Sequence, residues 1–319
     1  MRILVTGPDG FVGTAVCSTL QEHGFLVRGA QWKAVPLVEG CESVVVGDIN
    51  AQTEWSAALE QVDVVVHLAA RVHIMDDPSA DPLEAFRSVN VEGTRRLAQA
   101  AASAGVKRFV FISSIKVNGE ETAKGDAAFS EKDEPAPVDP YGISKWEAEK
   151  VLREIEAKSD LEVVVLRPPL LYGPGVKANF LKLIQWVDKG IPLPLGGIQN
   201  QRSLLGLTNF ADLILQCCIA DQAAGHTFLV SDGDDVSSGE LVKRIAKALG
   251  KSPRLVSIPE SAMKFAGGIL GKSAQIQRLC SSLRIDSSNA QTTLHWQPPC
   301  TMDEELSRVT VWFKIAKQK

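Results

Sequence analysis

The chain has 319 residues, of which 45% are hydrophobic and 23% charged, and its formal net charge is −4. This is the composition of an ordinary soluble globular protein, and no block of Lys or Arg marks a nucleic-acid-binding face. The length exceeds what one hydrophobic core usually supports, so we expect two domains, or one domain with a large lobe.

The first residues and the cysteines indicate the compartment. MRILVTG reads as a strand rather than a secretory leader, and no apolar stretch reaches the roughly 18 residues that span a bilayer. The six cysteines show neither disulfide nor metal-ligand spacing. We therefore expect a cytoplasmic protein with reduced thiols, without a metal ion and without membrane insertion.

Short apolar runs alternate with longer helical patterns through the first half of the chain. The runs are almost continuously apolar, as strands buried on both faces are. Strands are predicted at residues 2–7, 25–31, 43–48, 63–70, 108–114 and 161–168. Helices are predicted at residues 11–24, 51–61, 90–105 and 140–158. This alternation predicts an α/β fold with a Rossmann-type, doubly wound parallel sheet.

From about residue 168 the alternation stops, and Pro and Gly residues mark loops and turns. We expect a smaller, mixed C-terminal lobe. The predicted dinucleotide-binding domain comprises residues 1–167 and about 204–220, where LLGLTNFADLILQCCIA returns to the first domain. The lobe takes residues 168–203 and 221–319.

The first predicted strand runs into TGPDGFVG, which places Gly7, Gly10 and Gly13 between a strand and a helix. Gly7 allows a tight turn, Gly10 lets the backbone approach a pyrophosphate, and Gly13 lets the helix pack closely on the sheet. The helix N-terminus at Phe11 and Val12 offers unpaired N–H groups to the phosphates. A glycine-rich turn without a ligand is the alternative.

The rest of the cofactor site is less well defined. At the end of the second strand Gln31 stands where a ribose-binding carboxylate is usual, while Arg28 and Lys33 are near enough to suit a 2′-phosphate. NAD and NADP therefore both remain open. We expect the adenine beside Asp48 and Ile49, and the cofactor beside the end of the fourth strand. The residues expected at that strand end are Leu68, Ala69 and Ala70.

The sequence YGISK begins a predicted helix and places Tyr141 and Lys145 one turn apart on the same face. A neighbouring ammonium group lowers the pKa of a phenol and makes it a usable acid and base near neutral pH. The fifth strand ends in Ser113 and Ser114, at the sheet edge where ligands bind in such folds. The alternative is that Tyr141 only packs in the core and that Lys145 is a solvated helix residue.

The motifs TGPDGFVG, HLAA, VNVEGT, FISS, YGISK and LRPPLLYGPG occur in this order. Together they resemble the extended short-chain dehydrogenase/reductase superfamily, and within it the nucleotide-sugar epimerase/dehydratase family. The resemblance implies bound NAD(P) and hydride chemistry on a nucleotide-linked sugar. It also implies roles for Tyr141 as general acid/base, for Lys145 as its tuning group and ribose ligand, and for Ser114 as the catalytic serine. Asn90 matches a buried family Asn.

Three reactions of that family need separating. The dehydratases carry an Asp–Glu pair just after the catalytic Ser or Thr, whereas this chain has Ile115 and Lys116. ARVHIMDD, SSIKVNGE and the Asn118 of VNG resemble bacterial UDP-4-keto-6-deoxy-N-acetylhexosamine reductases of surface-polysaccharide (O-antigen) synthesis. We therefore rank NAD(P)H-dependent 4-ketoreduction first and a UDP-hexose 4-epimerase with bound NAD second. A non-catalytic dinucleotide-binding sensor is the third hypothesis.

The resemblance also implies residues for a UDP-sugar substrate and a partner chain. Ser114 and Lys116 are candidates to contact the sugar, and for Lys116 we favour the alternative of an exposed loop charge. Asn179 and Arg202 match positions near the sugar diphosphate, where a guanidinium suits a planar, bidentate task, and Arg278 is a weaker candidate. Family members often pair through the helix carrying Tyr and Lys and the one before it, so we expect a homodimer.

Overall fold

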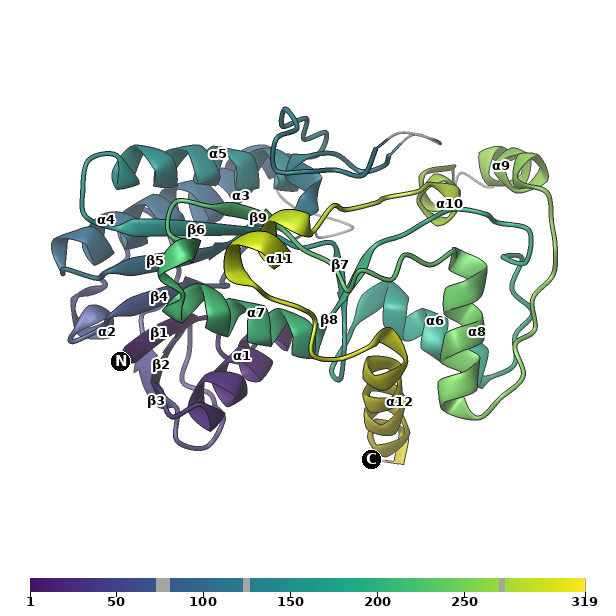
Figure 1. Cartoon of the computed structure of the whole chain (residues 1–319), viewed down its shortest axis with the longest axis horizontal. Coiled ribbons are helices and arrows are strands. Elements are labelled where there is room, and N and C mark those ends of the chain that lie inside the picture. Colours follow the sequence, from purple (N-terminus) through teal and green to yellow (C-terminus); the bar gives the residue numbers. More distant parts are fainter. Residues whose placement is uncertain (73–80, 123–126, 270–272, 319) are drawn as a thin grey trace.

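In the computed structural model, which describes residues 1–72, 81–122, 127–269 and 273–318, the chain forms a larger α/β domain and a smaller lobe (Figure 1). The domain contains a seven-stranded sheet, paired in parallel throughout, in the order β3-β2-β1-β4-β5-β6-β9. Its strands are β1 (Arg2–Thr6), β2 (Leu26–Gln31), β3 (Glu42–Val45), β4 (Val64–His67), β5 (Arg108–Ile112), β6 (Glu162–Arg167) and β9 (Thr227–Leu229). The predicted Rossmann-type sheet is confirmed.

Alternate residues of each strand face opposite layers of helices. In β1, Ile3 and Val5 pack with one layer and Leu4 packs with the other, and all three side chains are fully buried. The first layer consists of α1 (Phe11–Glu22) and α7 (Leu207–Ile219). The second consists of α2 (Ser56–Leu59), α4 (Thr94–Ser103) and α5 (Pro140–Glu156). Burial on both faces explains why the strands are almost continuously apolar.

Three predicted elements differ in detail. The helix expected over 51–61 is only the single turn of α2, and β3 ends three residues before Asp48. The helix expected over 90–105 instead begins as α3 (Pro82–Arg87), passes through a π-helical turn, η1 (Ser88–Gly93), and continues as α4. Such π-helical turns inside α-helices are rare and are found mostly at functional sites.

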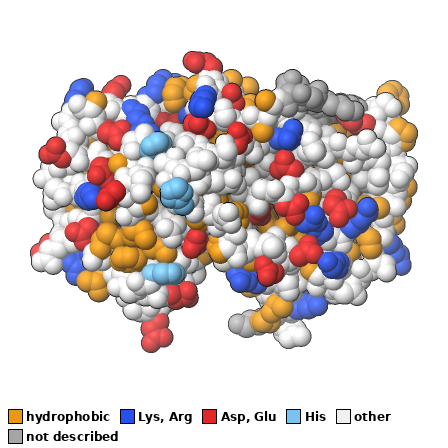
Figure 2. Space-filling view, in the orientation of Figure 1, with side chains coloured by type: hydrophobic (Ala, Val, Ile, Leu, Met, Phe, Trp, Pro, Cys, Tyr) orange, Lys and Arg blue, Asp and Glu red, His pale blue; other side chains and the backbone are white. Residues whose placement is uncertain are grey.

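The smaller lobe is built on a two-stranded parallel sheet and helices. The strands are β7 (Leu170–Tyr172) and β8 (Leu204–Gly206), and the helices are α6 (Ala178–Asp188), α8 (Ser238–Leu249), α9 (Glu260–Ile269), α10 (Ser273–Cys280) and α12 (Met302–Gln318). Its core contains buried residues of β7, α6, α8 and α12. Over α8 and α12 charges of both signs are interspersed, with Arg244 paired to Asp234 and Lys247 to Asp303 (Figure 2).

Two later segments join the larger domain rather than the lobe. β9 extends the seven-stranded sheet beside β6, and α11 (Ser288–Leu294) packs against it. Trp296 lies in the core under α7 and donates its indole N–H to Asp212 at 2.7 Å. The expected lobe of 168–203 and 221–319 therefore includes two segments that belong to the larger domain. β9 is the edge strand of its sheet, and α11 packs against that strand.

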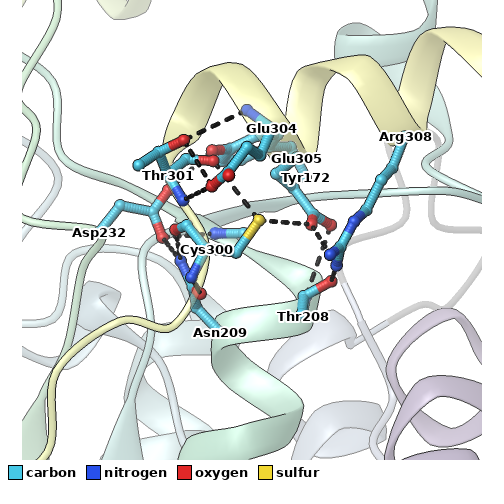
Figure 3. Close-up of polar contacts among 10 residues, drawn as sticks. Tyr172, Thr208, Asn209, Asp232, Cys300, Thr301, Glu304, Glu305 and Arg308 are labelled. Carbon is cyan, nitrogen blue, oxygen red and sulfur yellow. Dashed lines mark hydrogen bonds and ion pairs between the residues drawn. The ribbon is translucent and has the colours of Figure 1, made fainter.

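A buried polar network joins the lobe to the first turns of α7 (Figure 3). Asn209 donates to Asp232 at 2.7 Å and exchanges two hydrogen bonds with the backbone of Cys300, which precedes α12. Tyr172 donates to the same Asp232 at 2.8 Å, and the fully buried Glu305 of α12 accepts from the backbone N–H of Thr208 at 3.5 Å. The C-terminal helix is thus attached to the larger domain through side chains of both parts.

Among the residues that the structure describes, no helix is long and apolar enough to cross a membrane. All six cysteines have free thiols, and five of them are buried.

Candidate active site

The glycine turn after β1 has the geometry of a phosphate cradle. Gly7 has φ +67°, a left-handed conformation that favours glycine. A Cβ on Gly13 would lie 2.0 Å from the carbonyl oxygen of Gly7, so only glycine fits there. Gly10 is the N-cap of α1 and makes no side-chain cap, so the N–H groups at Phe11 and Val12 have no cap acceptor from it. These residues fit the pyrophosphate of a dinucleotide.

The cradle lies beside the end of β4, where the strand order reverses around β1. The hydroxyl of Thr6 accepts hydrogen bonds from the backbone N–H groups of Leu68 (3.1 Å) and Ala69 (3.0 Å), and Ala69 lies 3.4 Å from the position of a Cβ on Gly7. The structure therefore brings the predicted HLAA segment, with Ala70 next to it, against the glycine turn. This switch point is where ligands bind in open α/β sheets.

The structure brings Ser114, Tyr141 and Lys145 together at the carboxyl end of β5. Asp139 caps α5 by accepting from the N–H of Gly142 at 2.7 Å, so Tyr141 stands in the first turn. The Ser114 side chain hydrogen-bonds the phenol of Tyr141. The ammonium of Lys145 donates to the carbonyl of Ile112 at 2.7 Å and lies 6.0 Å from the centroid of the Tyr141 ring.

The charges at this site differ from the sequence-based expectation. Burial, followed by the charge of Asp139, raises the pKa of Tyr141 to about 12, whereas the bond from Ser114 lowers it. Burial lowers the pKa of Lys145 to about 7, and the charge of Glu149 opposes that shift. With a pKa of about 7, Lys145 is protonated in about half of the molecules at pH 7. Burial, and not the charge of Lys145, is therefore the largest influence on the pKa of Tyr141.

Asn90 joins the cofactor side of the site to the catalytic helix. Its amide donates to the carbonyl of Arg71 and to the hydroxyl of Ser144, both at 3.0 Å, and accepts from the Arg71 N–H at 2.8 Å. Ser144 in turn donates to the carbonyl of Tyr141 at 2.8 Å. The π-helical turn places this side chain between the loop after β4 and α5. Asn90 therefore connects the backbone of Arg71 to the side chain of Ser144 in α5.

Arg28 is placed where it cannot serve as the predicted 2′-phosphate ligand. It lies in the middle of β2 and forms a bidentate pair with Glu42 at 3.0 Å. Its guanidinium also donates to three backbone carbonyls at the end of α2. At the end of β2, Gln31 is buried and bonds Val35 and Ser43.

The other residues expected around the adenosine are exposed or structural. Lys33 is exposed and lies over the ring of Trp32, 3.8 Å from its centroid. Asp48 is exposed in the loop after β3, and its carbonyl accepts from the hydroxyl of Thr53 at 2.8 Å. Ile49 packs on Gly93, where an added Cβ would lie 2.6 Å from it. Ile49 therefore supports the π-helical turn that carries Asn90.

Lys116 is committed to an ion-pair cluster rather than free for substrate. Its ammonium pairs with Asp139, the cap of the catalytic helix, and with Glu120 at 3.0 Å. The sequence did not reveal the pair with Asp139, because the two residues are far apart along the chain and only folding brings them together. Lys116 helps to fix the N-terminus of α5.

The residues expected to bind the diphosphate lie in the smaller lobe. Asn179 is exposed in the first turn of α6. Arg202 donates to the carbonyl of Ser281 at 3.2 Å, and its backbone pairs with Leu283, which packs with Ile115 next to Ser114. Arg202 is therefore connected to the active-site strand end. Arg278 belongs to α10, but its side chain lies outside the described part of the structure.

A buried cluster beneath the catalytic residues was not predicted. Glu149 accepts from the hydroxyl of Ser113 and from both arms of the Arg167 guanidinium, at 3.0 and 2.6 Å. Arg167 also donates to Asn118 at 2.9 Å, and Asn118 donates to the carbonyl of Ser130 at 3.0 Å. The periodicity offered one clue, since Glu149 lies one turn after Lys145.

A model of the NAD dependent epimerase/dehydratase family matches residues 3–230. The chain belongs to this family. The expected membership of the extended short-chain dehydrogenase/reductases, and with it an NAD-dependent enzyme, is confirmed.

Members of the epimerase/dehydratase family similar to this chain include epimerases. The chain is 46% identical over 319 residues to the UDP-glucose 4-epimerase of Vibrio cholerae, covering 99% of this chain and 97% of the relative. It is 27% identical over 327 residues to the N-acetyl-alpha-D-glucosaminyl-diphospho-ditrans,octacis-undecaprenol 4-epimerase of Escherichia coli O157:H7, covering 96% and 93%. MoeE5, solved in complex with UDP-glucuronic acid and NAD, matches with a TM-score of 0.79 at 26% identity, covering 99% and 100%.

Proposed function

We propose that the protein is a UDP-hexose 4-epimerase that interconverts UDP-glucose and UDP-galactose with a resident NAD. The observation that carries this proposal is the 46% identity to a UDP-glucose 4-epimerase over 99% of the chain. The assembled Ser114, Tyr141 and Lys145 support it, since epimerisation at C4 requires a group that removes and returns a proton.

The comparisons favour this second hypothesis over the 4-ketoreductase that we ranked first. One argument for the reductase was Asn118, which stands where the epimerases usually have Tyr. In the structure the Asn118 side chain is 3% exposed. Its amide oxygen accepts from Arg167, and its amide nitrogen donates to the carbonyl of Ser130. It is therefore a structural residue, and its identity does not favour reduction over epimerisation.

The chemistry of the site follows from the position of the phenol. The phenolate of Tyr141 accepts the proton of the sugar 4-hydroxyl as C4 becomes a ketone, and the resulting phenol returns that proton to the oxygen when the carbinol re-forms. A protonated Lys145, whose ammonium lies 6.0 Å from the Tyr141 ring centroid, favours this phenolate. Ser114, bonded to the phenol, is placed to hydrogen-bond that same oxygen. NAD bound on the glycine cradle would supply reversible hydride acceptance, and Lys145 would hydrogen-bond its ribose. One phenol serves both epimers, because the 4-keto sugar rotates in the site and presents its opposite face to the returning hydride.

NAD is the proposed cofactor rather than NADP. Arg28, one of the two candidates for a 2′-phosphate, is paired with Glu42 and with carbonyls at the end of α2. The other candidate, Lys33, is exposed and lies on Trp32. A 2′-phosphate at the end of β2 would thus lack the buried, bidentate partner that such a group requires.

Incubating the purified full-length protein with UDP-galactose and no added cofactor tests the proposal. UDP-glucose should appear on anion-exchange chromatography, and acid denaturation should release NAD that is identified by mass spectrometry. Turnover that requires NADPH and a UDP-4-keto-6-deoxy sugar would instead establish the reductase. Bound dinucleotide with no turnover of any UDP-sugar would favour the sensor hypothesis.

The homodimer remains a prediction. Its expected contact is a four-helix arrangement of α5 and the helical run before it in two copies. Sedimentation at micromolar concentration should give about twice the mass of the chain, and a monomer would contradict the prediction.

A further inference from the structure

Three consecutive residues at the end of β5 contact three successive turns of the catalytic helix. The hydroxyl of Ser114 bonds Tyr141, the carbonyl of Ile112 accepts from Lys145, and the hydroxyl of Ser113 donates to Glu149. The three helix residues stand at i, i+4 and i+8, so they form one stripe along α5. Glu149 thus follows Lys145 by the same four residues that separate Lys145 from Tyr141.

The third contact is an ion pair that is fully enclosed. Glu149 and Arg167 are 2% and 4% exposed, and Ser113 beside them is 2% exposed. Burying two charges is costly and is often neutral or unfavourable for stability by comparison with apolar residues. A buried pair directly beneath catalytic residues therefore calls for a reason other than folding energy.

The charges around Lys145 supply that reason. On α5 it faces Tyr141 and Glu149, and on β4 it faces His67, whose ring burial keeps neutral. β5 contributes the Ile112 carbonyl and the face of Phe111, 4.6 Å from the ammonium. β6 contributes Arg167, which bonds Glu149 directly. Among the described residues, Glu149 is the carboxylate whose charge favours the protonated form of Lys145.

We propose that Glu149, anchored by Arg167, is a positioning residue that holds the β5 end against α5 and keeps Lys145 in its charged form. Arg167 fixes the carboxylate bidentately from the neighbouring strand, so the contact does not depend on the helix alone. A charged Lys145 has three donors for a carbonyl and a ribose, and its charge favours the phenolate of Tyr141. The kinetic part of this proposal rests on the epimerase function proposed above.

The first test measures Lys145 without catalysis. In protein labelled with [¹³C]lysine, the Lys145 signal, identified by its loss in Lys145→Met, should titrate near pH 7. Glu149→Gln should lower this midpoint by roughly one pH unit, because it removes a buried negative charge. Glu154→Gln is the matched control, since Glu154 is an exposed residue of the same helix, and it should leave the midpoint unchanged.

The second test uses turnover of UDP-galactose. The ratio of wild-type to Glu149→Gln kcat should increase from pH 6 to pH 9, because Lys145 of the variant loses its proton at lower pH. A purely structural defect would lower kcat by the same factor at every pH. Failure of the wild type to turn over UDP-hexoses would refute the proposed function, while the titration would still decide the role of Glu149.

Glu149→Gln leaves Arg167 without its partner, so the variant can fail to fold. Glu149→Gln combined with Arg167→Met replaces the whole pair by neutral groups of similar size and avoids that cost. It should also lower the Lys145 midpoint, since Glu149 is the charge that supports it. A folded single or double variant with a wild-type Lys145 midpoint and a wild-type pH profile would overturn the proposal.

Discussion

At the scale of single residues, the two tyrosines of this chain have different tasks. Tyr141 bonds Ser114 at the carboxyl edge of the sheet, whereas Tyr172 is fully buried and donates to Asp232 between the two parts of the molecule. In the proposed function, the same type of side chain therefore serves chemistry at one position and folding at the other. Nothing in the local sequence of Tyr172 forbids a catalytic role, and only its burial assigns it to structure.

Tyr141→Phe removes the hydroxyl but keeps the ring that packs edge-on against Phe86. We expect kcat for UDP-galactose to fall by roughly 10²- to 10⁴-fold, the usual contribution of a positioned acid/base, with the fold and bound NAD retained. Tyr172→Phe is the control, because it removes the only other phenol; it should cost about 1 kcal/mol of stability but change kcat little. An active Tyr141→Phe enzyme would remove the phenol from the mechanism.

His67 predicts how stability responds to acid. It is enclosed between Thr6 (2.8 Å) and Thr94 (3.0 Å), and burial, with the nearby charge of Lys145, lowers its pKa to about 3. A histidine that is neutral when folded but titrates near 6.5 when unfolded stabilises the protein fully above pH 6.5. That contribution is lost as pH falls from 6.5 toward 3, by about 2 kcal/mol between pH 7 and pH 5.

Urea unfolding at pH 7 and pH 5 measures this dependence. His67→Gln should reduce the loss of unfolding free energy between the two pH values by about 2 kcal/mol relative to the wild type. The exposed His23 is the control position, and His23→Gln should leave the dependence as it is. Equal losses in wild type and His67→Gln would show that the ring is not buried in its neutral form.

At the scale of elements, the π-helical turn is the feature that positions the catalytic helix from the cofactor side. It presents Asn90 to the backbone of Arg71 and to Ser144 at the same time. An uninterrupted α-helix over the same residues would change the direction of the side chain relative to α4. The turn therefore explains why the helix predicted over 90–105 is not regular.

Asn90→Ala should destabilise the protein by about 3 kcal/mol, because it removes three hydrogen bonds of a buried amide, two with the backbone of Arg71 and one with Ser144. Glu92→Ala in the same turn removes only a surface pair with Arg95 and should cost less than about 1 kcal/mol. Chemical denaturation followed by fluorescence measures both. Similar losses in the two variants would mean that Asn90 does not bridge the loop and the helix.

At the scale of the whole molecule, the site lies where the domain and the lobe meet, so their relative position matters. The network of Figure 3 attaches the segment before α12 to the start of α7 through Asn209, Asp232 and Cys300. Asn209 is fully buried and uses its whole amide in this contact. We infer that this side chain limits movement of the lobe that carries Arg202.

Asn209→Ala should lower the unfolding free energy by about 3 kcal/mol, since it breaks three buried hydrogen bonds across the two parts. It should also raise KM for UDP-galactose more than it lowers kcat, because the proposed function assigns UDP-sugar binding to the lobe and proton transfer to Tyr141. Thr208→Ala, which loses an exposed contact with Arg308, is the neighbouring control. A variant with unchanged melting temperature and KM would contradict this role of the network.

The features that depend on local chemistry could be predicted from the sequence. Buried parallel strands are continuously apolar, glycine alone tolerates the turn at Gly7 and the contact at Gly13, and a helix places residues i and i+4 on one face. The Rossmann-type sheet, the cradle and the pairing of Tyr141 with Lys145 follow from these rules.

Which charged side chains are available to a ligand, and which are already in ion pairs, depends on the folded chain. Arg28 and Lys116 are cations near predicted ligands in the sequence, yet Glu42 and Asp139 neutralise them from segments that only folding brings near. The same holds for Glu149 and Arg167, and for the burial that raises the pKa of Tyr141 and lowers that of Lys145. Desolvation and long-range pairing depend on neighbours in space, and a linear sequence does not record them.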